Sequence, residues 1–466
     1  MVTYTYNINS SNSNIQNVIN RIKEELSTNP VIERDIEVTI DKGTYSGFSI
    51  PDGALYPLFG TAYRLLIKSV PGSFPIVDFN HSNENQIVGI DIGAGNPNVT
   101  ISGLRVQYFA VGIRATLNSH YPLVNNCIIN NNRNVGIFFE QCKEAQAVQN
   151  IVINGDYGIV SRLCKSSAIV HNTVFMNGAI STNVGTSNAC IWAELANDYG
   201  AGAADTGLLH LVGNIGWNTT GRVLTLFISD VEEGRVISNY NDWVKSTDDF
   251  IALEDNAFYR GPESRPRKTF KTLNEWKNIG LDLNSKSEDP KFISPIKIRK
   301  DRNGYALDLN ILPVSPVLGT VPSFAYDTTY VSTYLPVYFD TTLLLKDILN
   351  QNRNQSNTAI GANDKPSSSG FFGQDIFSNP LDLGLSKTCG ISPFSDVLFK
   401  SLELWYPKFK KGYFYSNERE YYLYSKKQTK TLGEISQTTF SLPAKLASNK
   451  EIKIRVAGQL IDSSYY

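Results

Sequence analysis

Short apolar runs separated by Gly, Asn and Ser return along the first half of the chain at a nearly constant interval. The segments AVGIRAT (110–116), NVGIFFE (134–140) and DYGIVSR (156–162) place three glycines 24 and then 22 residues apart: Gly112, Gly136 and Gly158. A column of asparagines has the same two intervals: Asn126, Asn150 and Asn172. Because two independent columns share one interval, the sequence predicts a structural repeat of about 22–25 residues.

Each repeat contains β-type runs of about three to five residues, which are too short for a β-α-β crossover. Two or three short strands per turn, stacked at the strand spacing of about 4.8 Å, are typical of a parallel β-solenoid. Weaker copies at 213–218 and 238–243 extend the predicted coils over about 35–260. We expect the glycines where the coil bends tightly and the asparagines in a hydrogen-bonded ladder. The isoleucines after the glycines should form an interior column: Ile113, Ile137 and Ile159.

The N-terminal segment has the spacing of an amphipathic helix over residues 14–28. Its apolar positions recur every three or four residues: Ile15, Val18, Ile19, Ile22 and Leu26. Ser13 and Gln16 have the spacing of a capping box, and Asn29-Pro30 ends the pattern. We expect this helix to cover the open end of the first coil, ahead of an opening strand at 35–47.

Composition narrows the functional classes. The 466 residues carry a net charge of −1 and are 41% hydrophobic, as in a globular protein. No basic excess favours nucleic acid, and no apolar run is long enough to insert in a membrane. The first residues lack the basic and apolar regions of a signal peptide, so we expect synthesis in a cytoplasm without the usual export.

Further columns follow from the same register. Cys142 and Cys164 should stack as buried apolar residues, since five scattered cysteines without C-x-x-C favour neither a disulfide frame nor a zinc site. Thr116, Glu140 and Arg162 each lie four residues after a column glycine. Glu140 and Arg162 therefore face each other across adjacent coils, either as a surface ion pair or with Glu140 as a catalytic carboxylate.

Several segments resemble right-handed parallel β-helix proteins of the pectate-lyase-like superfamily. They include IEVTIDKGTYSGFSI (36–50), VTISGLRVQYFAVGI (99–113) and TLNEWKNIGLDLNSKSEDPKF (272–292). The closing part of the match depends on the following residues: Trp276, Asp282, Ser285, Asp289-Pro290, Phe292, Ser315-Pro316, Asn352-Arg353 and Gly361-Ala362. The resemblance covers about 15–364 and implies the fold. It does not imply an activity, because this fold is shared by lyases, hydrolases and inert structural proteins.

Four segments follow from these patterns. Residues 1–34 hold the capping helix, and 35–364 form the β-helix and its closing segment. Residues 365–372 have the composition of a linker. Residues 373–466 are Tyr-rich, with a predicted turn at Ser416-Asn417 and a strand at 450–456, and form a β-rich interaction module or an ordinary β core with Tyr at its edges.

No complete catalytic set is visible. The resemblance implies paired carboxylates for a hydrolase, or a calcium site with a base for a lyase; Asp248-Asp249 stands without its companion Gly-His-Gly motif. The remaining candidates are Glu140, Glu194 and Asp198; the last two lie with Asp205 beside Trp192, in a segment expected to bulge from the coils either as a sugar-binding insertion or as a plain surface loop. The four histidines have no metal-ligand spacing, so neither a metal nor a cofactor is expected.

The sequence therefore favours a non-catalytic role. A β-helix with an appended module and no export signal resembles a phage tail fibre, tailspike or baseplate protein. Such a protein would assemble in the host cytoplasm, belong to the virion, form a homo-oligomer such as a trimer, and contact other tail proteins through the C-terminal module and host surface polysaccharide. The alternatives are a polysaccharide lyase or glycoside hydrolase, including a tailspike depolymerase, and a bacterial surface adhesin, which would need an export or anchor signal.

Overall fold

The description of the fold comes from a computed structural model. It describes residues 4–9, 14–28, 35–61, 63–70, 73, 75–79, 82, 86–176, 188–196, 207–219, 221–244, 250–254, 268–294, 308–311, 315–324, 328–348, 350–363, and the strands between 413 and 461. Two compact units are present, 1–290 with 314–366, and 291–313 with 367–466. In the described residues no helix is long and apolar enough to cross a membrane.

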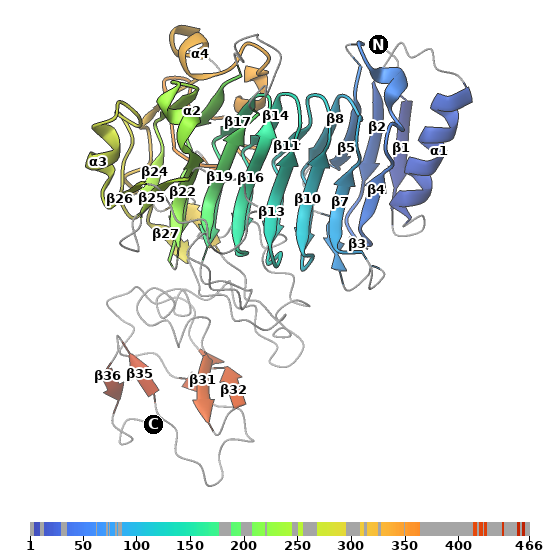
Figure 1. The fold of residues 1–466 in the computed structure, drawn as a ribbon. Helices are drawn as coiled ribbons and strands as arrows, with labels where there is room; N and C mark the ends of the chain where they lie inside the picture. The colour runs from blue at the N-terminus through green and yellow to red at the C-terminus, as the bar shows by residue number, and fades with distance from the viewer. Residues whose placement is uncertain are drawn as a thin grey trace. The chain divides into compact units, whose positions relative to one another are not determined.

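Three long sheets run along the first unit, and each coil adds one strand to each sheet (Figure 1). Sheet 1 contains, in spatial order, β1 (Tyr4–Ile8), β2 (Ile36–Ile40), β5 (Leu65–Ser69), β8 (Val99–Ser102), β11 (Leu123–Asn125), β14 (Ala145–Val148), β17 (Ser167–Val170), β20 (Leu209–Val212) and β23 (Val236–Asn239). Sheet 2 contains β4 (Phe48–Ile50), β7 (Val88–Ile92), β10 (Val111–Thr116), β13 (Val135–Glu140), β16 (Tyr157–Cys164), β19 (Ala189–Leu195), β22 (Arg222–Phe227), β25 (Ile251–Glu254) and β26 (Lys268–Phe270). Sheet 3 contains β3 (Thr44–Tyr45), β6 (Ile76–Asp78), β9 (Arg105–Gln107), β12 (Ile128–Asn130), β15 (Ile151–Ile153), β18 (Thr173–Met176), β21 (Ile215–Asn218) and β24 (Asp242–Val244).

All strand pairs within these sheets are parallel except β25 with β26, which run antiparallel. The predicted parallel β-helix is therefore confirmed. The opening strand expected at 35–47 is two strands, β2 and β3, which lie in different sheets. The sequence analysis missed β1, which precedes the helix and extends sheet 1 by pairing with β2. Its Ile8 is buried in the core.

The glycine column stacks as predicted, but for another reason. Ile113 pairs with Ile137 and Ile137 with Ile159, so Gly112, Gly136 and Gly158 lie in register. None of the three glycines has a positive φ. A Cβ at Gly136 would lie 2.5 Å from Val152 Cγ1 and 2.6 Å from the Gly158 carbonyl oxygen. Close packing between coils, and not the tight bend that we expected, therefore excludes a side chain here.

The asparagine ladder also forms, with one correction of register. Asn150, Asn172, Asn214 and Asn241 are buried, and each of the first three accepts from or donates to its neighbour in the next coil. In the coil before Asn150, the ladder position is occupied by Cys127. Its N–H donates to the Asn150 side chain at 3.0 Å. Asn126 lies one position earlier, with a φ of 53°. It belongs to a neighbouring column of left-handed residues, which asparagine tolerates well.

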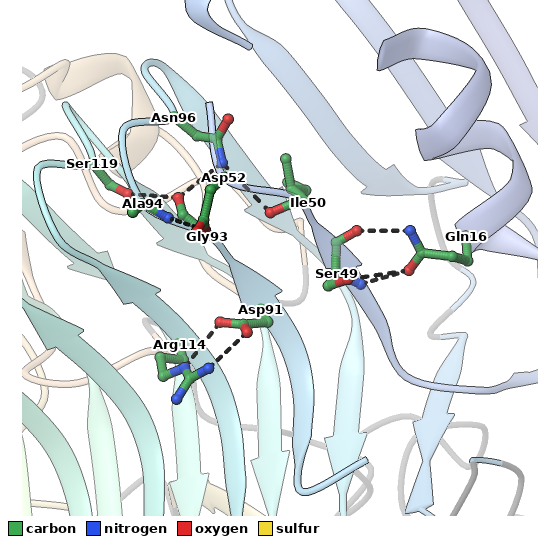
Figure 2. Close-up of polar contacts among 10 residues, drawn as sticks. All are labelled: Gln16, Ser49, Ile50, Asp52, Asp91, Gly93, Ala94, Asn96, Arg114 and Ser119. Atoms are coloured by element: carbon green, nitrogen blue, oxygen red, sulfur yellow. Dashed lines mark hydrogen bonds and ion pairs between the residues drawn. The ribbon is translucent and has the colours of Figure 1, made fainter. Parts of the chain in front are cut away.

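The predicted helix is α1 (Ile15–Thr28), which lies over the N-terminal end of the coils (Figure 1). All five residues of its apolar stripe are buried. The predicted capping box is wrong: the Asn17 N–H donates to the Asn14 side chain at 3.0 Å, so Asn14 is the cap. Gln16 instead binds β4, where its side chain accepts from the Ser49 N–H and donates to the Ser49 carbonyl (Figure 2).

The closing segment covers the last coils. Its short elements in the first unit are α3 (Leu273–Lys277), β29 (Val321–Pro322), α4 (Thr328–Tyr334), η3 (Thr341–Leu344) and β30 (Asn357–Thr358). Two other short helices lie within the coils: η1 (Tyr56–Leu58) after β4, and α2 (Ile228–Glu232) between β22 and β23. Residues that carried the family resemblance are buried in the closing segment. Asp282 accepts from Trp276 Nε1 at 2.7 Å and from the Asn241 amide at 2.8 Å, so it ends the ladder.

The second unit contains short antiparallel pairs. They are β27 (Phe292–Ser294) with β28 (Asp308–Ile311), β31 (Tyr413–Ser416) with β32 (Arg419–Tyr422), β33 (Tyr424–Ser425) with β34 (Phe440–Ser441), and β35 (Ile454–Val456) with β36 (Gln459–Ile461). Ser416 pairs with Arg419, as the predicted hairpin requires. The predicted linker 365–372 lies outside the described residues.

Candidate functional site

The candidate carboxylates Glu140 and Glu194 lie in one column on the outward face of sheet 2, with Arg162 between them. Glu140 pairs with Arg162 in the register of β13 and β16, and Arg162 pairs with Glu194 in the register of β16 and β19. An ion pair joins Arg162 Nη1 to Glu140 Oε1. The two residues therefore face each other across adjacent coils, as the shared register predicts.

Glu194 is the member of the column whose carboxyl group is least satisfied by hydrogen bonds. Its side chain is only 5% exposed, and no hydrogen bond reaches its Oε2 atom from the described residues. Burial raises the pKa of Glu194 to about 7; Arg162 partly opposes this rise, and Asp230 adds to it. A carboxyl group with a pKa near neutrality is the type of group that can act as a general acid.

The position of Arg162 argues against catalysis by the pair Glu140 and Glu194. Two strand spacings separate their backbones, or about 9.6 Å, which is near the upper limit for the carboxyl groups of an inverting glycosidase. In such an enzyme the sugar lies between the two carboxyl groups. Here the strand between them carries Arg162, which binds Glu140. The guanidinium group occupies the position that the scissile bond would need.

The segment expected to bulge from the coils, as a sugar-binding insertion or a plain surface loop, begins in a regular strand at Trp192, and its residues 197–206 lie outside the described part of the chain. Trp192 belongs to β19, which pairs with β16 and β22, and it is buried. Trp192 Nε1 donates to Glu254 Oε2 at 3.4 Å. The other two acidic candidates of this segment, Asp198 and Asp205, lie outside the described residues.

The acidic residues Asp230, Glu232 and Glu233 follow one another closely in the sequence, as in a solvated turn, but Asp230 is not solvated. Asp230 is fully buried, accepts from the Leu195 N–H at 2.8 Å and forms an ion pair with Arg235. Glu233 remains exposed and binds the same arginine at 2.9 Å. Asp230 therefore helps to anchor the end of β19.

Pairing of a carboxylate with an arginine recurs along sheet 2. Arg114 forms two hydrogen bonds with Asp91, at 2.9 and 2.7 Å (Figure 2). Arg222 forms a buried pair with Glu254 at 3.0 Å. Carboxylates on this face are thus mostly neutralised by arginines from neighbouring strands, and few are left to bind a cation.

Among the described residues, neither a group of metal ligands nor an exposed thiol forms a second candidate site. In the part of the chain that the structure describes, no three His, Cys, Asp or Glu side chains form a group that could hold a metal ion. Cys142 and Cys164 are buried and free, as predicted, and so are Cys127 and Cys190. Burial lowers the pKa of His171 well below its usual value, with Arg353 adding to the effect.

A cleft that the sequence analysis missed lies at the turn from sheet 2 to sheet 1. It encloses about 590 Å³ and is lined by Asn118, His120, Gln141, Cys142, Lys143, Leu163, Lys165 and Ala196. The backbones of His120 and Lys143 pair as an isolated parallel β-bridge between adjacent coils. In the next coil, the Lys165 N–H donates to the Cys142 carbonyl at 2.8 Å. The signal was present in the sequence, because residues 120, 143 and 165 are separated by the interval of the repeat.

Comparisons with known proteins support the fold. The family model "Right handed beta helix region" matches residues 60–198. Pectate lyase Pel9A is similar in structure, with 10% identity, a TM-score of 0.32, and coverage of 78% of this chain and 96% of the enzyme. XylC, solved in complex with xylose, has 12% identity, a TM-score of 0.33, and coverage of 71% of this chain and 60% of XylC. No curated protein sequence matches the chain. The family match and the parallel strand order of the three sheets together show that the chain contains a right-handed parallel β-helix, as the sequence resemblance implied.

Proposed function

We propose that the protein is a structural or receptor-binding component of a phage tail, such as a fibre, tailspike or baseplate protein. The β-helix serves as a rigid shaft, and the C-terminal module, residues 373–466, attaches it to neighbouring tail proteins. The protein is a homo-oligomer that assembles in the host cytoplasm and becomes part of the virion.

The observation that carries this proposal is the state of the outward carboxylates. Glu140 is bound by Arg162, which separates it from Glu194, and Asp91 is bound by Arg114. These pairs join one coil to the next, and they engage the carboxylates Glu140 and Asp91 on the described part of sheet 2. They resist sliding and bending of the coils. That property suits a shaft, whereas an active site needs its carboxylates free to reach a substrate.

The experiment is to purify particles of the phage that encodes the chain and to label them with antibodies against the full-length protein. We expect electron microscopy to show the label on the tail, and mass spectrometry to find the chain in the particles. Label confined to the particle-free lysate would contradict the proposal. Removing 373–466 should abolish incorporation while the remaining chain keeps its β-sheet circular dichroism.

A second candidate is a carbohydrate-active enzyme, either a polysaccharide lyase or a glycoside hydrolase. The observation that favours it is Glu194, whose buried carboxyl group has a pKa of about 7. The test is to incubate the protein with host exopolysaccharide and to measure chain length and new reducing ends. If the polymer is shortened and Glu194→Gln lowers the rate by about 100-fold or more, the enzyme reading replaces the structural one. An unchanged chain length supports the structural proposal.

A further inference from the structure

Exposed aromatic rings and lysines follow one another along the turn from sheet 2 to sheet 1. We call this surface the turn edge and define it by six residues: Tyr56, Phe59, His120, Tyr121, Lys143 and Lys165. The side chains of Tyr56, Phe59 and Tyr121 are 69%, 50% and 37% exposed. Exposed aromatic residues that gather in one place, and do not occur singly, mark a binding surface.

The rings form a continuous chain of contacts. Tyr56 and Phe59 stack with a centroid distance of 5.9 Å, and Phe59 meets the edge of His120 at 4.9 Å. His120 contacts Tyr121 at 6.2 Å. Lys143 Nζ lies 5.7 Å from the centre of the Tyr121 ring. The aromatic part of the turn edge therefore passes directly into its cationic part.

The cationic part lies in the cleft of about 590 Å³, which Lys143 and Lys165 line from successive coils. Neither lysine has an acidic partner within salt-bridge distance among the described residues. Burial raises the pKa of the Tyr121 hydroxyl group, and the nearby Glu144 raises it further. Burial lowers the pKa of His120, and the nearby Lys143 lowers it further, which disfavours a positive charge on this ring. Two lysines thus supply the charge of the cleft.

Buried polar side chains hydrogen-bond the backbone that carries the turn edge. Figure 2 shows two of them, Asn96 and Ser119, which both donate to the Gly93 carbonyl. Asn96 accepts from the Leu55 N–H at 3.0 Å and donates to the carbonyls of Pro51 and Gly93 at 2.9 and 2.8 Å. In the next coil, the Ser119 hydroxyl donates to the Thr116 carbonyl at 2.7 Å. These bonds fix the backbone that carries the rings before any ligand arrives, which lowers the entropy cost of binding.

We propose that the turn edge binds, without cleaving it, a glycan that carries anionic substituents. Apolar faces of sugar rings pack on Tyr56, Phe59 and Tyr121, and a carboxylate, phosphate or sulfate group of the same chain reaches Lys143 and Lys165 in the cleft. The coils repeat at about 4.8 Å, so an extended polymer can contact several coils at once. This inference rests on the receptor-binding form of the proposed function and names the class of receptor.

The test is calorimetry of the full-length protein with three probes: hyaluronan oligosaccharides, dextran sulfate and uncharged dextran. We expect the first two to bind and dextran to bind at least tenfold more weakly. The double variant K143Q/K165Q should weaken binding by about tenfold or more, and Phe59→Ala by about fivefold. Lys23→Gln, which removes an exposed lysine on α1, and Ile87→Ala, which trims an exposed apolar residue, are the matched controls and should bind as the parent does.

Four outcomes would overturn the inference. The first three are binding of dextran as tight as that of the charged polymers, equal losses in the control and turn-edge variants, and inorganic sulfate competing at the same concentration as the sulfated polymer. The last result would mean an ion site and not a glycan site. Failure of every probe to bind also overturns it, and leaves the tail-component proposal to its own test by antibody labelling of particles.

Added salt should weaken the binding of the charged probes, since charged contacts at a half-open surface are screened.

Discussion

Two columns of polar side chains run across the same coils and behave in opposite ways. In the turn from sheet 1 to sheet 3, Asn150, Asn172 and Asn214 repeat one group, and each amide bonds the next. On the outward face of sheet 2, Glu140 and Glu194 alternate with Arg162, which binds Glu140. Both columns are largely shielded from water, but only the amide column is satisfied along its length.

The difference follows from the donors and acceptors of the two kinds of side chain. An amide both donates and accepts, so a column of identical amides can satisfy every member in turn. Carboxylates only accept and guanidinium groups only donate, so an alternating column forms pairs. With two carboxylates and one arginine, the carboxyl group that is not paired must be buried at a cost. Glu194 is that group.

The largest expected effect is on the amide column. Asn172→Ala removes the acceptor of the Asn150 N–H, at 2.9 Å, and the donor to the Ala147 carbonyl, also at 2.9 Å. Because buried groups are left unsatisfied in two coils, we expect a loss of about 3–5 kcal/mol in the free energy of unfolding, measured by urea denaturation. Asn274→Ala, at an exposed position in α3, should change it by less than about 0.5 kcal/mol. Equal losses in both variants would refute the importance of the ladder.

Substitution in the glycine column of the same coils should have the next largest effect on the free energy of unfolding. Gly136→Ala places a Cβ against Val152 and the Gly158 carbonyl, and we expect a loss of about 2–3 kcal/mol. Gly234→Ala is the contrast, because open space surrounds it and only its φ of 70° opposes a side chain. It should cost about 1 kcal/mol. A smaller loss at Gly136 than at Gly234 would mean that the coils can separate to admit a methyl group.

Substitution in the column of Glu140, Arg162 and Glu194 should lower the free energy of unfolding by a smaller amount. Arg162→Gln removes the partner of Glu140 and the one cation that lowers the pKa of Glu194. We expect a loss of about 1–2 kcal/mol at pH 7, measured by the same urea titration. The control is Arg21→Gln, which breaks the exposed pair of Arg21 and Glu25 on α1 and should cost less than about 0.5 kcal/mol. A neutral Arg162→Gln would show that the column contributes nothing.

The sequence predicted the repeat well because each coil must satisfy the same packing. The glycine column, the apolar stripe of α1 and the pairing of Glu140 with Arg162 all follow from periodicity. Periodicity did not distinguish Asn126 from the true ladder, since two adjacent columns share one interval and both favour asparagine. It also missed β1, whose position depends on pairing with β2 across the intervening helix.

The candidate site was harder to predict than the fold. Trp192 and Glu194 interrupt the spacing of the glycines, which suggested an insertion, yet both residues belong to a regular strand. Asp230 is charged and lies in a short helix, and only tertiary structure reveals that it is buried beside Arg235. The turn edge brings together residues 56–59 and 120–165, which no local pattern connects.

One measurement tests most directly the claim that Glu194 is a structural carboxyl group without a hydrogen-bonded partner for its Oε2 atom. The measurement is the free energy of unfolding from about pH 4 to pH 8, for the parent and for Glu194→Gln. In the folded protein the pKa of Glu194 is about 7, above its ordinary value of 4.5. The folded state therefore binds more protons, and the parent loses stability as the pH rises from about 4.5 through 7.

Glu194→Gln lacks this contribution. With the difference between the two proteins at about pH 4 as the baseline, we expect the variant to gain about 3 kcal/mol on the parent by pH 8, since a pKa of about 7 lies roughly 2.5 units above the ordinary value. If the variant instead falls behind the parent as the pH rises, the ionised carboxylate stabilises the fold. Glu194 would then be a paired member of the charged column, and the contrast with the amide ladder would be wrong.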